Sequence, residues 1–150
     1  MGRGRDRIER EIFIRAGIER VWSLVSRAGF WVGDELRFDA DAAEGETVVM
    51  DAGERGRFPV RVERLDPPRY AAYRWASGFP GEEPRGDNAT LVEFTLSEQD
   101  GGVVVRVVES GFAALRGTPG FRAARHEDNA AGWAMQMARL VAAAEGAPRR

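Results

Sequence analysis

The chain has 150 residues, of which 43% are hydrophobic and 31% charged, as is typical of one soluble globular domain. A net charge of −2 argues against nucleic acid as a partner. The absence of cysteine excludes disulfides and thiolate metal sites, and the absence of lysine excludes lysine Schiff bases. No apolar run has the form of a secretory signal or of a membrane span. We therefore expect a cytoplasmic protein with no membrane partner.

The ends of the chain differ in composition from the rest. Both are rich in Arg together with Gly or Pro, so we expect flexible tails over residues 1–6 and 146–150. A single domain should then span residues 7–145.

The start of this domain predicts one strand and two helical segments. Residues 7–15 alternate isoleucine with charged residues, which indicates a strand. Residues 18–26 repeat apolar residues at helical spacing and precede a glycine that is suited to end a helix. Residues 29–33, GFWVG, are expected to form a second short helical turn, before an acidic, irregular segment over 34–45.

From residue 46 the apolar period changes to two, which predicts five further strands. Pro59 indicates that its strand lies at an edge or carries a bulge. Residues 77–88 are rich in Gly, Pro and acidic residues and predict a long loop, which we expect to be a mobile gate. The strands are expected over residues 46–52, 56–65, 70–76, 89–98 and 103–112.

The last predicted element is a long helix over residues 121–145, around which the other elements are organised. Its apolar residues are spaced by three and four, which places them on one helix face: Ala130, Trp133, Met137, Leu140, Val141 and Ala144. Gly132 lies within this helix and costs about 1 kcal/mol relative to alanine. Either a close approach to a strand or simple tolerance would explain it. The order of elements favours an α+β fold, with the helices on one face of a curved antiparallel sheet.

Four short motifs carry a resemblance to a known superfamily: ERVW (19–22), DPPRYAAYRW (66–75), VESGF (108–112) and GW (132–133). Together they resemble the START-like helix-grip (Bet v 1-like) superfamily, also called SRPBCC. Within it the chain is most similar to the AHSA1-like branch, named for the activator of Hsp90 ATPase. The resemblance covers roughly residues 7–145. One departure is Gly17, where this family often has proline before its first helix.

The resemblance implies an internal cavity between sheet and long helix that suits lipids, polyketides or other apolar molecules. Relatives include cyclases, hydrolases, carriers and a chaperone regulator, the last implying a role in stress response. No cofactor and no universal catalytic motif accompany the fold. The side chains expected to form the ligand-binding wall are Met50, Phe58, Tyr73, Trp75, Phe94, Val107, Glu109, Phe112, Trp133 and Met137. A core filled by these same residues is the alternative.

Besides Tyr73 of the predicted wall, Glu109 and His126 are titratable candidates for chemistry. Glu109 has the inward parity of its strand, so it needs a partner or a raised pKa, and Arg10 of the first strand is the candidate partner. The alternative is a residue at a strand end that reaches water. His126 is the only histidine and could be a general base, although the acidic residues that follow it also suit the start of a helix. One histidine without cysteine predicts no zinc site.

Three functions follow as hypotheses. The leading one is non-catalytic binding of a small apolar molecule, with no catalytic residue assigned. The first alternative is a cyclase or hydrolase for a polyketide-like substrate, using Glu109, Tyr73 or His126 as acid or base. The second is an interaction module that regulates a chaperone or self-associates. The sequence contains no P-loop, dinucleotide-binding, serine-hydrolase or zinc-protease motif.

Overall fold

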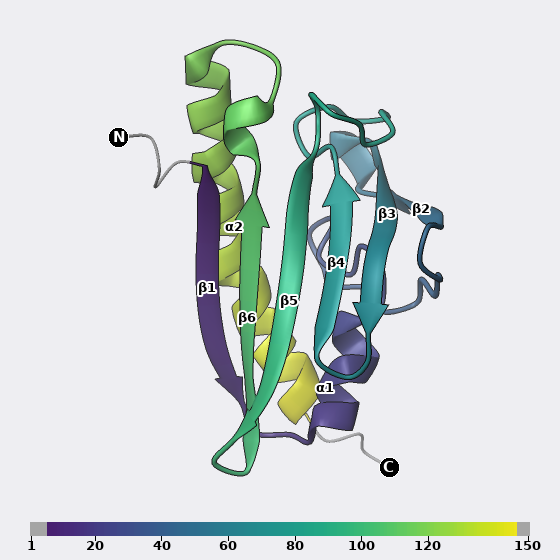
Figure 1. Cartoon of the computed structure of the whole chain (residues 1–150), viewed down its shortest axis with the longest axis vertical. Helices are drawn as coiled ribbons and strands as arrows, with labels where there is room; N and C mark the ends of the chain where they lie inside the picture. The colour runs from purple at the N-terminus through teal and green to yellow at the C-terminus, as the bar shows by residue number, and fades with distance from the viewer. Residues whose placement is uncertain (1–5, 147–150) are drawn as a thin grey trace.

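In the computed structural model, which describes residues 6–146, a curved six-stranded antiparallel sheet packs against one long helix (Figure 1). The strand order is β1-β6-β5-β4-β3-β2. The elements are β1 (Arg7–Ile14), α1 (Ile18–Val25), β2 (Thr47–Asp51), the 3₁₀ turn η2 (Gly53–Arg55), β3 (Arg57–Asp66), β4 (Tyr70–Trp75), β5 (Thr90–Gln99), β6 (Gly102–Ser110), the 3₁₀ turn η3 (Phe112–Ala114) and α2 (Pro119–Glu145). The predicted α+β helix-grip fold is confirmed.

Each predicted strand is present to within two residues at either end, and so is the first helix. The predicted short helical turn at 29–33 is wrong, because this segment forms hydrogen-bonded turns in which Gly29 has a φ of 71°. The predicted tails fall outside the described residues except for Asp6 and Gly146. Asp6 is not free: its backbone oxygen accepts a hydrogen bond from the Gly111 amide at 3.1 Å.

Strands β2 to β6 follow one another as an antiparallel meander. Pro59 lies in β3, which is not an edge strand, yet the β3–β4 ladder starts only at Val60, so the missing amide of Pro59 interrupts no bond to β4. β3 does carry a register irregularity, but between Val62 and Arg64 and not at Pro59.

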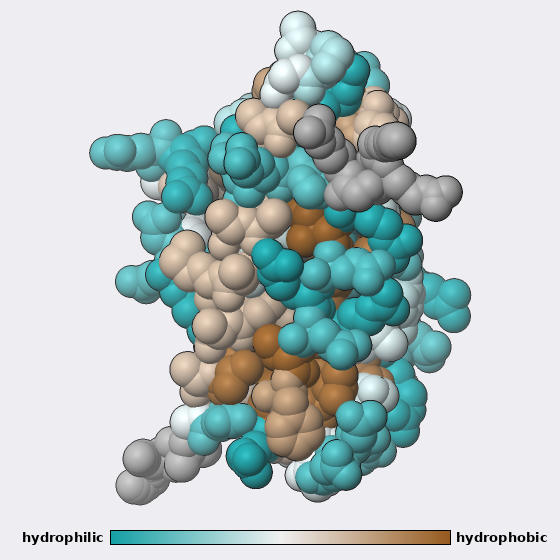
Figure 2. All heavy atoms as spheres, turned by 90° about the vertical axis from the view of Figure 1, so that its left-hand side faces the viewer, coloured by the Kyte–Doolittle hydropathy of each residue, from teal (hydrophilic) through white to brown (hydrophobic). Residues whose placement is uncertain are grey.

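β1 and α2 close the fold from opposite ends of the chain. β1 pairs with β6 along its whole length, with Ile8 opposite Glu109. α2 begins with Thr118, whose side chain accepts a hydrogen bond from the Phe121 amide, and with a proline in its first turn. It then crosses the inner face of the sheet, and its C-terminal end lies beside α1 (Figure 1). Figure 2 shows apolar side chains gathered on the side of the molecule formed by β1 and α2.

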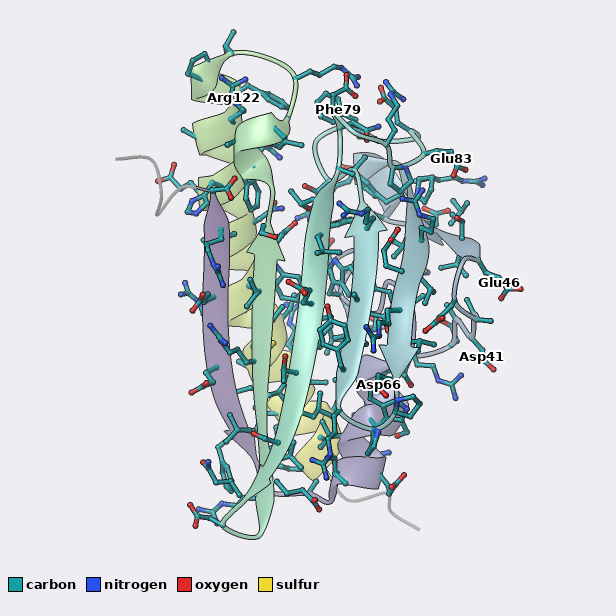
Figure 3. All side chains as sticks on the ribbon, viewed as in Figure 1. Asp41, Glu46, Asp66, Phe79, Glu83 and Arg122 are labelled. Atoms are coloured by element: carbon teal, nitrogen blue, oxygen red, sulfur yellow. The ribbon has the colours of Figure 1, made fainter. Side chains whose placement is uncertain are left out.

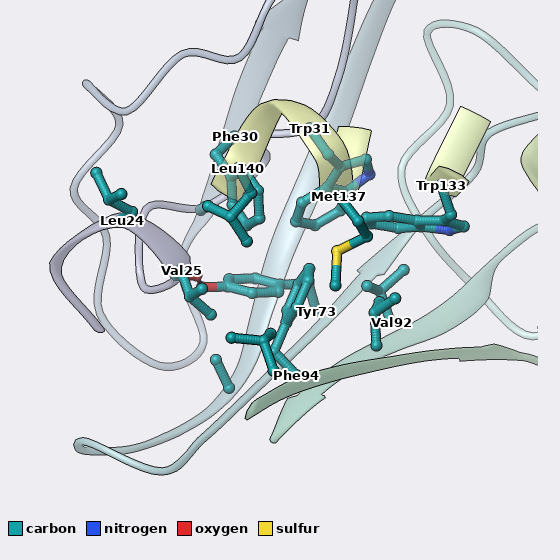
Figure 4. Close-up of a cluster of buried hydrophobic side chains, with 14 of the residues drawn as sticks. Leu24, Val25, Phe30, Trp31, Tyr73, Val92, Phe94, Trp133, Met137 and Leu140 are labelled. Atoms are coloured by element: carbon teal, nitrogen blue, oxygen red, sulfur yellow. Dashed lines mark hydrogen bonds between the residues drawn. The ribbon is translucent and has the colours of Figure 1, made fainter. Parts of the chain in front are cut away.

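The core fills the space between α2, α1 and the inner face of the sheet (Figure 4). Tyr73 and Phe94 project from the sheet, Met137 and Leu140 from α2, and all four are buried. The Tyr73 hydroxyl donates to the carbonyl oxygen of Val25 at 2.8 Å, and burial raises its pKa. The outer face of the sheet instead carries charged side chains (Figure 3). The apolar side of the sheet is therefore its inner face.

Candidate functional site

A cleft of about 1020 Å³ opens beside the core, between the N-terminal half of α2 and the loops that flank β3 and β4. It is lined by residues 31–34, by η2 and by the loop after β4. Five aromatic side chains form its apolar wall: Trp31, Phe58, Trp75, Phe121 and Trp133. Charged side chains also line it, with Arg55, Arg125 and Arg139 against Asp34 and Asp128. Ser77, Asn129 and Gln136 line it as well, so the cleft combines an aromatic wall with many polar groups. A concave site that combines apolar and polar side chains can hold a small molecule in a fixed orientation.

Trp31 separates this cleft from the core. Its ring centroid lies 5.3 Å from that of Tyr73 and 5.7 Å from that of Phe94, on the core side. It also lies 5.7 Å from Trp75 and 5.6 Å from Trp133, which line the cleft. The Gln136 amide donates to the Trp31 backbone oxygen at 2.8 Å and so ties the segment to α2. This tryptophan thus occupies the space where the sequence predicted a cavity.

The residues predicted to form the ligand-binding wall therefore fall into two groups in the structure. Phe58, Trp75 and Trp133 line the cleft. The other predicted wall residues are buried and do not line it: Met50, Tyr73, Phe94, Val107, Glu109, Phe112 and Met137. At these positions the alternative of a filled core holds. Trp31 was missed because a helical turn was expected there, although the run Phe30-Trp31-Val32 already signalled burial.

Glu109 lies directly behind the cleft wall and is fully buried, as its parity predicted. Four side chains hydrogen-bond its carboxylate. The Trp133 indole donates to one oxygen at 2.7 Å, and the Trp75 indole to the other at 3.0 Å. The Thr90 hydroxyl lies 2.5 Å away and the Asn129 amide 3.1 Å. Burial raises the pKa of Glu109, and these bonds oppose that rise.

Arg10 is not the partner of Glu109, contrary to prediction. It lies opposite Val107 in the β1–β6 ladder, is exposed, and its guanidinium donates to the Glu9 backbone oxygen at 3.5 Å. β1 is the edge strand, so a long side chain on its inner face reaches water around the free edge. Neutral donors hold Glu109 instead, and two of them are indoles that form the cleft wall.

Residues 15–145 match the family described as activator of Hsp90 ATPase homolog 1-like protein. The chain belongs to this family. No curated protein sequence matches it. The family resemblance read from the four motifs is confirmed, and membership supports a ligand-binding helix-grip fold in general terms.

Solved structures similar to this AHSA1-like chain share the fold at low identity. A protein from Mesorhizobium loti has a TM-score of 0.69 at 20% identity, with 90% of this chain and 93% of that chain covered. The Aha1 dimer from Colwellia psychrerythraea has a TM-score of 0.68 at 20% identity, with 93% and 96% covered. DynU16, of the dynemicin biosynthetic locus, has a TM-score of 0.66 at 23% identity. The match covers 91% of this chain but only 46% of DynU16.

The other candidate acid and base residues do not line the cleft. Nε2 of His126 lies 2.9 Å from the Arg7 backbone oxygen, and its ring packs edge-on against Phe112. Tyr73 uses its hydroxyl on the Val25 carbonyl oxygen. His126 thus connects α2 to β1, and Tyr73 connects the sheet to α1.

The β4–β5 loop, expected to be a mobile gate, is tied down at several points. The buried Asn88 amide donates to the Glu82 carboxylate at 3.0 Å, and Arg116 binds that same carboxylate at 2.8 Å. The hydrogen bond from Arg116 is the main cause that lowers the pKa of Glu82 to about 2. Phe79 packs on Phe121 of α2, with ring centroids 5.4 Å apart. These contacts oppose ready opening of the loop.

Within residues 6–146, no helix combines the length and the apolarity that crossing a bilayer would require. The same part of the chain brings no three acidic or histidine side chains together in a group that could hold a metal ion.

Proposed function

We propose that this AHSA1-like protein binds a small, mainly apolar molecule, lipid- or polyketide-like in size, in the cleft beside α2. The observation that carries the proposal is the aromatic wall of a cleft of about 1020 Å³, which is close to the upper limit of about 1000 Å³ for typical ligand pockets. The cleft lies beside the core, between the N-terminal half of α2 and the loops that flank β3 and β4. It is next to the space between sheet and helix where the family fold was expected to hold its ligand, which Trp31 fills. The cytoplasm stays the predicted location.

Binding without chemistry is favoured over catalysis by the placement of the acid and base candidates. Glu109 is sealed behind Trp75, Asn129 and Trp133, and all its bonds go to those groups and to Thr90. A general acid or base must come within hydrogen-bond reach of the atom it serves. None of Glu109, Tyr73 and His126 lines the cleft, so none is placed for that role.

Self-association or binding to a chaperone is a second proposed role. The family description names the Hsp90 ATPase activator, and one similar structure is described as a dimer. Such a role needs an exposed apolar surface, and Phe13 on β1 is 37% exposed.

The binding proposal is tested by blocking the cleft. A Cβ atom at Gly132 would meet no atom within 4 Å, so Gly132→Leu places its side chain in the cleft. We expect it to weaken binding of the apolar fluorophore N-phenyl-1-naphthylamine at least tenfold, measured by fluorescence titration. The matched control is Ala138→Leu, on an exposed position of α2 outside the cleft, which should bind as the unmodified protein does.

Two results would contradict the proposal. One is an unmodified protein that fails to bind the fluorophore. The other is a Gly132→Leu variant that binds it as tightly as Ala138→Leu does. Native mass spectrometry of the protein purified from its own host should also show a retained ligand, whose mass would give its class.

A further inference from the structure

One tryptophan N–H in the cleft wall lacks a partner. Trp31 is 4% exposed, and its indole nitrogen is buried with no hydrogen-bond partner among residues 6–146. Trp75 and Trp133, beside it in the wall, both donate their N–H to Glu109. Buried polar groups are hydrogen-bonded in roughly 90% of cases or more, and a buried tryptophan usually finds an acceptor. A buried, unpaired donor on a residue of the cleft wall therefore points to an acceptor that the ligand brings.

The position of Trp31 is set by other contacts. Gln136 donates to the backbone oxygens of both Trp31 and Gly33, at 2.8 and 3.1 Å. The Trp31 ring meets Phe30 and Trp75 edge-on, at interplanar angles of 89° and 87°. Because backbone and ring are both held, the donor is preorganised and would lose little entropy when it binds.

A second unpartnered donor lines the same cleft, the buried Nε of Arg125. Acceptors in the cleft are instead already used. Ser77 Oγ accepts from Asn129 at 3.0 Å, and Gln136 Oε1 accepts from Arg139 at 3.3 Å. The two carboxylates at the rim are paired, Asp34 with Arg55 and Asp128 with Arg125. The cleft thus contains free hydrogen-bond donors and few free hydrogen-bond acceptors.

We propose that the bound molecule is an apolar body carrying an acceptor oxygen, a carbonyl or a carboxylate, and that this oxygen binds the Trp31 N–H. Arg125 would add a preference for the carboxylate over the carbonyl, because a carboxylate has a second oxygen to accept from the free Arg125 Nε while the other end of this guanidinium stays paired with Asp128. This inference rests on the proposed binding function and specifies its ligand class. A pure hydrocarbon would fill the wall but leave both donors unpaired.

The test compares three probes of similar shape: 2-ethylnaphthalene, 2-acetylnaphthalene and 2-naphthoate. Each competes with N-phenyl-1-naphthylamine for the unmodified protein and its variants. We expect the ketone to bind about three- to tenfold more tightly than the hydrocarbon, as one hydrogen bond supplies. In Trp31→Phe the ratio of the ketone affinity to the hydrocarbon affinity should be near one. Both probes lose the same contacts with the wall in this variant, so the change in the ratio reports the loss of the N–H donor alone. Arg125→Gln should reduce the advantage of naphthoate over the ketone.

The matched control is Trp22→Phe, which changes a partly buried tryptophan of α1 outside the cleft and should leave both ratios unchanged. If Trp31→Phe does not fold, ¹⁵N spectra of the unmodified protein decide the question. The indole N–H signal of Trp31 should shift downfield with the ketone and not with the hydrocarbon. Equal affinities for ketone and hydrocarbon, or an unmoved Trp31 signal, would overturn the inference. If no probe binds, the binding function itself fails.

Discussion

The two halves of α2 meet the sheet in different ways. The C-terminal half, from Met137 to Ala144, packs on Tyr73 and Phe94 in a filled apolar core closed by α1. The N-terminal half, from Phe121 to Gln136, borders the cleft. Each half buries one polar group of the sheet: Tyr73 has one backbone partner, whereas Glu109 has four side-chain partners. One helix thus combines a rigid support with a wall open to a ligand.

The largest expected effect compares a phenylalanine from each region. Phe94→Ala removes a fully buried ring and should lower the free energy of unfolding by about 3–5 kcal/mol. Phe58→Ala should cost less, about 1–3 kcal/mol, because part of that ring already faces the cleft. Urea denaturation measures both. Phe58→Ala, but not Phe94→Ala, should also change the affinity for the fluorophore directly. Equal losses of stability would mean that the cleft wall is as well packed as the core.

The next effect concerns the polar group behind the cleft. In Glu109→Gln the new NH₂ group must face at least one indole or amide donor, so we expect a loss of about 1–3 kcal/mol. Because burial raises the Glu109 pKa above its ordinary 4.5, the folded state keeps the proton longer than the unfolded chain does. The contribution of Glu109 to the free energy of unfolding therefore has its full value below pH 4.5. It falls as the pH rises through the pKa of Glu109 in the folded protein.

The glutamine at position 109 of the variant does not titrate. The difference in free energy of unfolding between the unmodified protein and Glu109→Gln should therefore be largest at low pH and become smaller as the pH rises. Urea midpoints measured between pH 4.5 and 8 for both proteins test the sign. A deficit that grows with pH would show that the ionised carboxylate is the form the site stabilises. Glu93→Gln, on another strand of the sheet and only part-buried, is the control.

The smallest expected effect is a gain. Gly132 has open space around its missing Cβ, so of the two explanations left open by the sequence, simple tolerance fits and a close approach to a strand does not. Gly132→Ala should raise the free energy of unfolding by about 0.5–1 kcal/mol, because alanine favours the helix. The same methyl group enters the cleft and should weaken binding of the fluorophore slightly. A loss of stability would mean that the helix needs glycine here for a reason the contacts do not show.

The fold could be predicted because its signals are local and repeated. Alternation defined the strands, spacing by three and four defined α2, and DPPRYAAYRW identified the β3–β4 hairpin. The turn segment around Trp31 could not be predicted, because its shape depends on Gln136, which follows it by 105 residues and holds its backbone.

The site was predicted in part for the same reason. The parity of β6 showed that Glu109 faces inward, and the helix face placed Trp133 beside the sheet. Parity alone could not find the donors of Glu109, since Thr90, Asn129 and the two indoles come from three different elements. Parity also could not show that Trp31 fills the space between the sheet and α2. Because Trp31 lies there, most of the residues predicted to form the ligand-binding wall belong to the core.

The order of elements along the chain has a consequence for how this protein is made. Arg7 of β1 pairs with Ser110, so the first strand synthesised waits for the last strand before its ladder can form. α2 leaves the ribosome later still, and until then only α1 and the segment around Trp31 can cover the apolar inner face of the sheet. A nascent chain that has completed its meander therefore still exposes the part of this face that α2 covers in the folded protein, and this apolar surface favours aggregation. Only the final 27-residue helix removes that risk, so truncations within α2 should be found in the insoluble fraction.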